Sequence, residues 1–149
     1  MLVKLLPEQI ASNWDFLKTC IVEDVPLERG SRINRNANIL NLLLIDEMQC
    51  WVDVRSRGDK TEIRVVVITQ FYGDNVSGNR NMLIYSLVGL NSIFDLTTWR
   101  KGMLTLLQYA RGKGCNQVLA YSDNESVLTF VKRLGADTSQ RLIVMSLDA

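Results

Sequence analysis

The chain has 149 residues, of which 47% are hydrophobic and 22% are charged. This length and composition predict one compact domain over residues 1–149, with a core large enough to fold without disulfides or metal ions. Seventeen Lys and Arg residues against sixteen Asp and Glu residues leave a formal net charge of +1. General nucleic-acid binding is therefore not expected, because it requires a global basic field.

The residue types present restrict the chemistry that the chain can perform. The sequence contains no His, which removes the usual catalytic base, the Ser–His and Cys–His pairs and the commonest metal ligand. The spacing of Cys20, Cys50 and Cys115 does not fit zinc or dithiol motifs, so we interpret them as buried, reduced, apolar residues. No apolar run approaches the roughly 20 residues of a membrane span, and no signal peptide is apparent. We therefore expect a soluble protein without a metal site.

The first half of the chain alternates short helical and loop segments. Residues 1–6 predict a strand, and a helix begins at Pro7 and ends before Pro26; its apolar face consists of Ile10, Trp14, Leu17 and Ile21. Residues 27–38 predict a loop whose positive charges are Arg29, Arg32 and Arg35. Asn36 or Asn38 then caps a helix over residues 39–45 that is apolar nearly all round. This helix, with Ile39 and Leu43, either packs under the preceding loop or contacts a partner together with the three arginines.

The second half predicts a hairpin followed by alternating helices and strands. Strands are expected over residues 50–55, 61–72 and 81–90, with turns at 56–60 and 73–80. A helix capped by Thr97 or Thr98 runs to Lys113, and its apolar face consists of Trp99, Met103, Leu106, Leu107 and Ala110. A strand over 117–122, a helix over 125–134 and a strand over 141–147 follow. The order β-α-α-β-β-β-α-β-α-β predicts an α/β fold, in the sense of a mixed α+β sheet with helices on both faces.

This element order resembles the Gcn5-related N-acetyltransferase (GNAT) superfamily over nearly the whole chain. The best local match is similar to the family segment that begins with Asn after the fifth strand and ends in Leu-Gly-Phe, with Ala136 in place of the aromatic residue; it consists of Asn124, Val127, Phe130, Val131, Lys132, Leu134 and Gly135. The resemblance implies acetyl-coenzyme A as cofactor. It also implies a pyrophosphate loop of backbone amides, two parted central strands for the pantetheine arm, and acid and base groups for the amine.

The sequence departs from the family pattern at the pyrophosphate loop. The resemblance places this loop after residue 90, where residues 91–98 contain no Gly and include Asp95. A negative charge there opposes the binding of two phosphates, whereas Asp95 and the threonines suit helix capping. If the chain is active, Ser92, Thr97 and Thr98 with nearby amides are the candidates to hold the coenzyme.

The acid and base of the family are also hard to place. The resemblance aligns Val131 with the Tyr that protonates the departing thiolate in many members. Tyr121 or Tyr85 is a candidate replacement, although a Tyr on a strand is more often packed at the rim of a core. The carboxylates of Glu62, Asp74 and Glu125 lie at element ends and turns, where a base for the amine is not expected.

Two further features point away from catalysis. The sequence ends soon after residues 141–147, where many family members add a strand, so we expect an exposed strand edge that invites another chain. The segments 81–87, 99–102, 109–110, 114–115, 120–122 and 124–125 resemble acetyltransferase-like proteins encoded by tailed bacteriophages near their structural genes. That resemblance implies a scaffold that uses its surface for partners.

The sequence therefore supports three hypotheses. The first is a catalytically degenerate acetyltransferase fold acting as a structural or assembly protein of a phage virion, with no cofactor and with copies of itself and other virion proteins as partners. The second is a divergent acetyl-coenzyme A-dependent N-acetyltransferase, which positioning alone can sustain in part. The third is a small-ligand module in a cleft between the strands that begin at Asn81 and Gln117. The expected location is the virion or the host cytoplasm.

Overall fold

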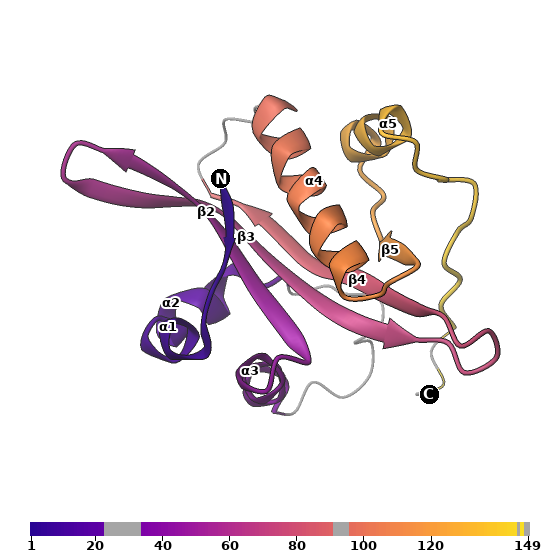
Figure 1. Cartoon of the computed structure of the whole chain (residues 1–149), viewed down its shortest axis with the longest axis horizontal. Coiled ribbons are helices and arrows are strands. Elements are labelled where there is room, and N and C mark those ends of the chain that lie inside the picture. Colours follow the sequence, from indigo (N-terminus) through magenta and orange to yellow (C-terminus); the bar gives the residue numbers. More distant parts are fainter. Residues whose placement is uncertain (23–33, 91–95, 146, 148–149) are drawn as a thin grey trace.

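The computed structural model describes residues 1–22, 34–90, 96–145 and 147 (Figure 1). The predicted loop residues Arg29 and Arg32 and the predicted coenzyme ligand Ser92 lie outside the described residues. In chain order the elements are β1 (Leu2–Lys4), α1 (Pro7–Ser12), α2 (Trp14–Leu17), the short 3-10 helix η1 (Lys18–Cys20), α3 (Arg35–Leu44), β2 (Met48–Arg57), β3 (Lys60–Gly73), β4 (Arg80–Gly89), α4 (Leu96–Gly112), β5 (Gln117–Ala120) and α5 (Glu125–Arg133). None of the helices in the described residues is long and apolar enough to span a membrane.

A five-stranded mixed sheet organises the chain. The strands lie in the order β1-β2-β3-β4-β5, with β1 to β4 antiparallel and β5 parallel to β4. Helices α1, α2 and α3 lie on one face of the sheet, and α4 and α5 lie on the other (Figure 1). The predicted fold class, a mixed α/β sheet covered on both faces, is confirmed.

The core consists of two layers, one on each face of the sheet. Alternation along β2 divides the side chains between them, since Cys50 and Val52 pack with the α1–α3 layer while Trp51 packs with the α4 layer. In α4 the predicted apolar face is confirmed, because Leu106 and Ala110 are buried against Met82 of β4. Together the two layers hold β2, β3 and β4 rigidly in the middle of the domain.

Helix boundaries in the first half differ from those predicted. The predicted single helix is interrupted at Asn13, where α1 ends and α2 begins. Helix α3 starts at Arg35, before the predicted cap; its first flanking residue is Asn34 in the left-handed conformation (φ 62°), without a side-chain cap bond. Asn tolerates this conformation better than most residues, so the chain can turn there without Gly. The predicted caps Asn36 and Asn38 lie in or beyond the first helical turn.

The last predicted strand is not formed. The described residues of the stretch 141–147 belong to no strand, and large side chains there are exposed. A sequence rich in Leu, Ile and Val favours a strand, but a strand exists only where a second backbone pairs with it. The prediction of a strand over residues 141–147 was therefore wrong, because its described residues pair with no other strand of the chain.

The turn between β3 and β4 is organised by Asp74. Its carboxylate accepts hydrogen bonds from the Ser77 hydroxyl and from the backbone N–H groups of Val76 and Ser77, both at 3.2 Å. The hydroxyl bond first, and then the two backbone bonds, lower the pKa of Asp74 below its ordinary value. Gly78 follows with φ 73°, a conformation that favours glycine.

This depressed pKa predicts a pH-dependent contribution to stability. Because the folded pKa lies below the unfolded one, the contribution is present above the unfolded pKa and is lost as pH falls through the folded pKa. We expect Asp74→Ala to lower the midpoint of thermal unfolding at neutral pH, and the difference from wild type to shrink in acid. Melting curves over a pH series test this. A difference that is the same at every pH would contradict it.

Candidate functional site

The central strands β4 and β5 part halfway along β4. They are paired from Asn81 opposite Gln117 to Ile84 opposite Ala120, and β5 ends there. Strand β4 continues to Gly89, still paired with β3 on its other side. We call the place where β4 and β5 part the fork. The sheet is thus unpaired on the β5 side of β4 beyond Ile84. The cleft predicted between the strands that begin at Asn81 and Gln117 can lie only beyond these paired positions, and it stays a prediction.

A bulge in β4 coincides with the fork. Ile68 of β3 pairs with Ser86, and Thr69 pairs with Ile84. Tyr85 is therefore the extra residue of the bulge and has no partner residue on β3. A bulge adds local twist and ends regular pairing, and such bulges are common beside active sites. The bulge is anchored from the α1–α3 face, because the Ser86 hydroxyl accepts a 2.9 Å hydrogen bond from the Val22 N–H. The opening of the sheet is therefore built into the β4 backbone.

The two candidate tyrosines both stand at the fork. Tyr85 and Tyr121 are the first residues after the last paired positions, Ile84 and Ala120, on their respective strands. Tyr121 is 43% exposed, whereas Tyr85 is half-buried and packs against the α1–α3 core layer. The structure thus brings together the only two positions that the sequence offered as acids. Their catalytic role stays a prediction.

Helix α4 begins close in sequence to the open end of β4. The Leu90 N–H, directly after β4, donates to the Arg64 carbonyl at 2.6 Å, and the helix starts at Leu96. Its first turn contains Thr97 and Thr98, two of the predicted coenzyme ligands, and no acidic residue. Exposed Arg100 and Lys101 follow in the next turn. The described part of this helix start therefore suits a polyanionic group, because the positive end of the helix dipole and two cations lie there. Asp95, whose negative charge is expected to oppose phosphate binding, directly precedes the helix and lies outside the described residues.

None of the three carboxylates considered as bases belongs to a part of β4 or β5 that borders the fork. Glu62 lies opposite Arg55 in the β2–β3 hairpin, which projects beyond the helices (Figure 1). Asp74 belongs to the β3–β4 turn described above. Glu125 opens α5 directly after Asn124, whose side chain caps the helix by accepting from the Ser126 and Val127 N–H groups. Glu125 thus complements the helix dipole, as expected.

Of the predicted partner-contact residues that the structure describes, two are buried in the core and one bonds the backbone of the same chain. Ile39 and Leu43 are 4% and 2% exposed and belong to the α1–α3 core layer. Arg35 donates from its guanidinium to the Val22 carbonyl and so joins α3 to the end of the first helical region. The buried face of the helix therefore packs against its own sheet and not against a partner, whereas most of the loop under which it was predicted to pack lies outside the described residues. Its exposed large apolar side chains are Leu44 and, directly after the helix, Ile45.

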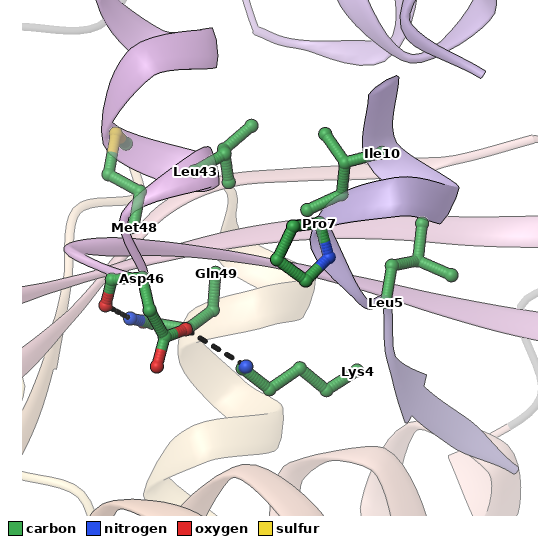
Figure 2. A pocket seen from close by; sticks show the side chains of 8 residues that line it. All are labelled: Lys4, Leu5, Pro7, Ile10, Leu43, Asp46, Met48 and Gln49. Atoms are coloured by element: carbon green, nitrogen blue, oxygen red, sulfur yellow. Dashed lines mark hydrogen bonds and ion pairs between the residues drawn. The ribbon is translucent and has the colours of Figure 1, made fainter. Parts of the chain in front are cut away.

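A pocket of about 200 Å³ lies on the other side of the molecule, near the β1 edge of the sheet (Figure 2). It is lined by Lys4, Leu5, Pro7, Ile10, Leu43, Asp46, Met48 and Gln49. Its polar groups bond to one another, since Lys4 Nζ lies 2.9 Å from the Asp46 carboxylate and Gln49 Nε2 donates to the Asp46 carbonyl at 2.7 Å. The pocket lies toward the β1 edge of the sheet, away from the fork, and the only candidate residue among its lining is Leu43.

A chain of buried polar side chains links β2 to β3 near this pocket, and no sequence pattern predicted it. The indole N–H of Trp51 donates to the Thr69 hydroxyl at 3.0 Å, and that hydroxyl donates to Gln49 Oε1 at 2.8 Å. Trp51 also meets Tyr109 of α4 edge to face, with ring centroids 4.8 Å apart. The Tyr109 hydroxyl is buried without a hydrogen-bond partner, and its burial, followed by the charge of Asp46, raises its pKa. These groups fix how α4 sits on the sheet.

The cysteines are free thiols with no part in the fork. Cys20 and Cys50 are buried, as predicted, whereas Cys115 is only half-buried. Burial, with a smaller contribution from Cys20, raises the pKa of Cys50 to about 12. The Cys50 thiol is therefore protonated at neutral pH and is not a nucleophile.

Comparisons with known proteins identify the architecture. No family profile matches the sequence, and no curated protein sequence matches it either. Solved structures match along their whole length. A Trypanosoma brucei acetyltransferase is 19% identical, with a TM-score of 0.66 and 99% of each chain covered. An aminoglycoside acetyltransferase from an uncultured soil metagenomic sample is 15% identical, with a TM-score of 0.71, and covers 100% of this chain and 97% of its own.

The chain has the GNAT acetyltransferase fold. A further neighbour, an aminoglycoside N-acetyltransferase solved in complex with CoA, is 12% identical with a TM-score of 0.67 and both chains covered at 100%. The predicted fold is thereby confirmed. In terms of this fold, the fork is the parted pair of central strands that the sequence resemblance implied but could not show.

Proposed function

We propose that the chain binds an acyl-coenzyme A thioester at the fork and transfers the acyl group to an amine. The observation that carries this proposal is the parting of β4 and β5 at Ile84 and Ala120, with the bulge at Tyr85 beside it. A slot between strands admits a thin pantetheine-like chain, and the exposed β4 backbone offers it hydrogen bonds. The GNAT fold of the neighbours, one of which is solved with CoA, supports the same function.

The groups around the fork suit such a ligand. The coenzyme carries its phosphates at one end, and the α4 start provides a positive helix end followed by Arg100 and Lys101. Thr97 and Thr98 lie in that first turn as the predicted ligands. When bound, the coenzyme supplies the activated acyl group, and the chain supplies position and a tyrosine hydroxyl.

Titration of the purified chain with acetyl-coenzyme A by calorimetry tests this proposal. We expect saturable binding at micromolar concentration, and a Thr97→Glu variant should bind about tenfold more weakly, because the added charge repels the phosphates. An acid in the first turn favours the helix itself, so the variant should fold. Gln108→Glu adds the same charge further along α4, at an exposed position, and should bind as wild type does.

No heat from a folded sample at millimolar coenzyme would overturn the proposal. Equal binding by wild type and Thr97→Glu would place the phosphates away from the start of α4. Only the first outcome would direct attention to the second candidate function.

The second candidate is a catalytically degenerate GNAT fold acting as a structural or assembly component, for which the resemblance to tailed-phage proteins suggests a virion. Two observations favour it. Val131 stands where the resemblance requires the acid, and the considered carboxylates lie on a projecting hairpin, a turn and a helix cap. The test is capture of the protein from its native assembly with identification of its neighbours. A free protein without assembly partners, able to bind coenzyme, would contradict it.

A further inference from the structure

The pocket shown in Figure 2 lies where two connections of the chain come together. On one side, β1 ends at Lys4 and α1 begins at Pro7. On the other side, α3 ends at Leu44 and β2 begins at Met48. Helices α1 and α3 and strand β2 each contribute buried side chains to the α1–α3 core layer, so the core holds the walls of the pocket in place. Small-molecule sites are usually preformed in this way.

The lining of this pocket is apolar on one side and polar on the other (Figure 2). The buried side chains of Ile10, Leu43 and Met48 form the apolar side. Lys4 and Asp46 form the polar side, where the Lys4 ammonium lies 2.9 Å from the Asp46 carboxylate. A few polar groups on otherwise apolar walls are the usual composition of a small-molecule site. The lining therefore suits a ligand with one apolar end and one polar end.

The volume of the pocket limits the size of that ligand. The pocket has about 200 Å³, and a cavity of about 150 Å³ is enough to hold benzene. A single ring or a short branched chain with one polar group therefore fits, whereas a whole coenzyme does not.

The polar side of the pocket offers hydrogen-bond donors to a ligand. A Lys ammonium has three N–H groups and a Gln amide has two. Among the described residues, the Lys4 ammonium bonds the Asp46 carboxylate and Gln49 Nε2 donates to the Asp46 carbonyl, which uses one N–H group of each donor. The Asp46 side chain is 49% exposed and its charge is screened by water, whereas the Lys4 side chain is only 29% exposed. A carboxylate is therefore the group that complements this side best.

The residue type at position 46 is a further sign that the polar side is a built feature. Asp46 has a φ of 64° directly after the end of α3. Its N–H bonds the Leu43 carbonyl at 3.3 Å, and the Glu47 N–H bonds the Leu42 carbonyl at 3.0 Å. Helices that end with these two bonds usually have Gly at this position, because Gly adopts a positive φ without strain. Asp in place of Gly supplies the carboxylate that positions the Lys4 ammonium at the pocket.

We propose that this pocket binds a small apolar carboxylate. The ring or branched chain of the ligand lies against Ile10 and Leu43, and its carboxylate accepts hydrogen bonds from Lys4 Nζ and Gln49 Nε2. Such a ligand contacts β1, α1 and α3 at once, and it stabilises the folded chain by mass action. The pocket shares no residue with the fork, so this proposal is independent of coenzyme binding.

Calorimetric titration of the full chain with sodium benzoate at constant ionic strength tests the proposal. We expect saturable binding with a dissociation constant at or below about 1 mM, and a higher midpoint of thermal unfolding in saturating benzoate. Benzyl alcohol has the ring without the charge and should bind about tenfold more weakly. Acetate has the charge without the ring and should show no saturable binding, because it buries almost no apolar surface.

Two variants and one control locate the ligand. Lys4→Met removes the ammonium but keeps an unbranched side chain, and Asp46 stays in contact with water, so the variant should fold. We expect it to bind benzoate about tenfold more weakly and benzyl alcohol as wild type does. Lys18→Met is the matched control, because Lys18 pairs with Asp15 at 3.5 Å and does not line the pocket. Leu5→Phe enlarges a half-buried lining side chain and should weaken the binding of both ligands.

Three outcomes would overturn the proposal. The first is a folded wild-type chain that gives no saturable heat with benzoate. The second is benzoate binding that is the same in wild type and in Lys4→Met, or in wild type and in a Leu5→Phe variant with an unchanged circular dichroism spectrum. The third is tighter binding of benzylamine than of benzoate, which would mean that the Asp46 carboxylate, and not the Lys4 ammonium, selects the ligand.

Discussion

Replacing Tyr121 by Phe is expected to lower the rate of acyl transfer by about 10²–10⁴-fold, the usual contribution of a general acid. Tyr121 stands directly past the last paired residue of β5 and is 43% exposed. An acid that protonates a departing thiolate must recover its proton from solvent in each cycle, which requires such exposure. Tyr85 stands at the same fork on β4 but packs into the α1–α3 core layer.

Tyr85→Phe is therefore the matched control, because it removes the same hydroxyl from the other side of the fork. We expect its rate to stay within a few-fold of wild type, and both variants to bind the coenzyme as wild type does. The measurement is steady-state transfer to an amine, with coenzyme affinity determined separately by calorimetry. A large loss of rate in Tyr85→Phe alone would mean that Tyr85, and not Tyr121, is the acid. Equal rates in all three proteins would mean that transfer relies on positioning without a tyrosine acid.

Local patterns predicted most of the fold because each pattern depends on neighbours in sequence. The alternation in 50–55 identified β2, and the apolar run within 61–72 identified β3. Asn124 marked the start of α5 by its capping chemistry. The apolar spacing of α4 correctly gave Leu106 and Ala110 as its buried face. Pro7 likewise marked the start of α1.

Relations between strands could not be predicted in this way. The bulge at Tyr85 exists only in the register of β3 against β4, and nothing in residues 81–90 distinguishes it. The end of pairing between β4 and β5 at Ala120 likewise depends on how two strands are aligned, and no local pattern marks it. Residues 141–147 have a strand-forming composition, but strand formation also needs a partner backbone, which a single chain does not supply. The sequence therefore predicted the candidate residues Tyr85 and Tyr121, but not the bulge and the end of pairing that place them at the fork.

The buried polar chain is the clearest feature that patterning missed. Gln49 and Thr69 are polar residues, for which a sequence pattern predicts exposure to solvent. Their side chains are nevertheless only 1% and 0% exposed. They are tolerated because the Thr69 hydroxyl bonds both Gln49 and Trp51, and the Gln49 amide also donates to the Asp46 carbonyl. The pattern of apolar and polar residues cannot show such mutual satisfaction, since Gln49 and Thr69 are far apart in sequence.

Thr69→Val should lower the free energy of unfolding by about 2–4 kcal/mol, although the two side chains have nearly the same shape. The Thr69 hydroxyl accepts from Trp51 Nε1 at 3.0 Å and donates to Gln49 Oε1 at 2.8 Å. Its removal leaves both groups buried and unpaired, at a cost of about 1–3 kcal/mol each. Denaturant unfolding followed by Trp fluorescence measures the change.

Two further variants separate the hydroxyl from the methyl group of Thr69. Thr69→Ser keeps both hydrogen bonds and should lose only about 1 kcal/mol for the missing methyl. Thr19→Val is the control for the exchange itself, because the Thr19 hydroxyl bonds the Phe16 carbonyl at an exposed position and should matter by less than about 0.5 kcal/mol. If Thr69→Val were as stable as Thr69→Ser, water or another group would have to reach Trp51 and Gln49. The buried chain would then not be what holds β2 and β3 in register beneath α4.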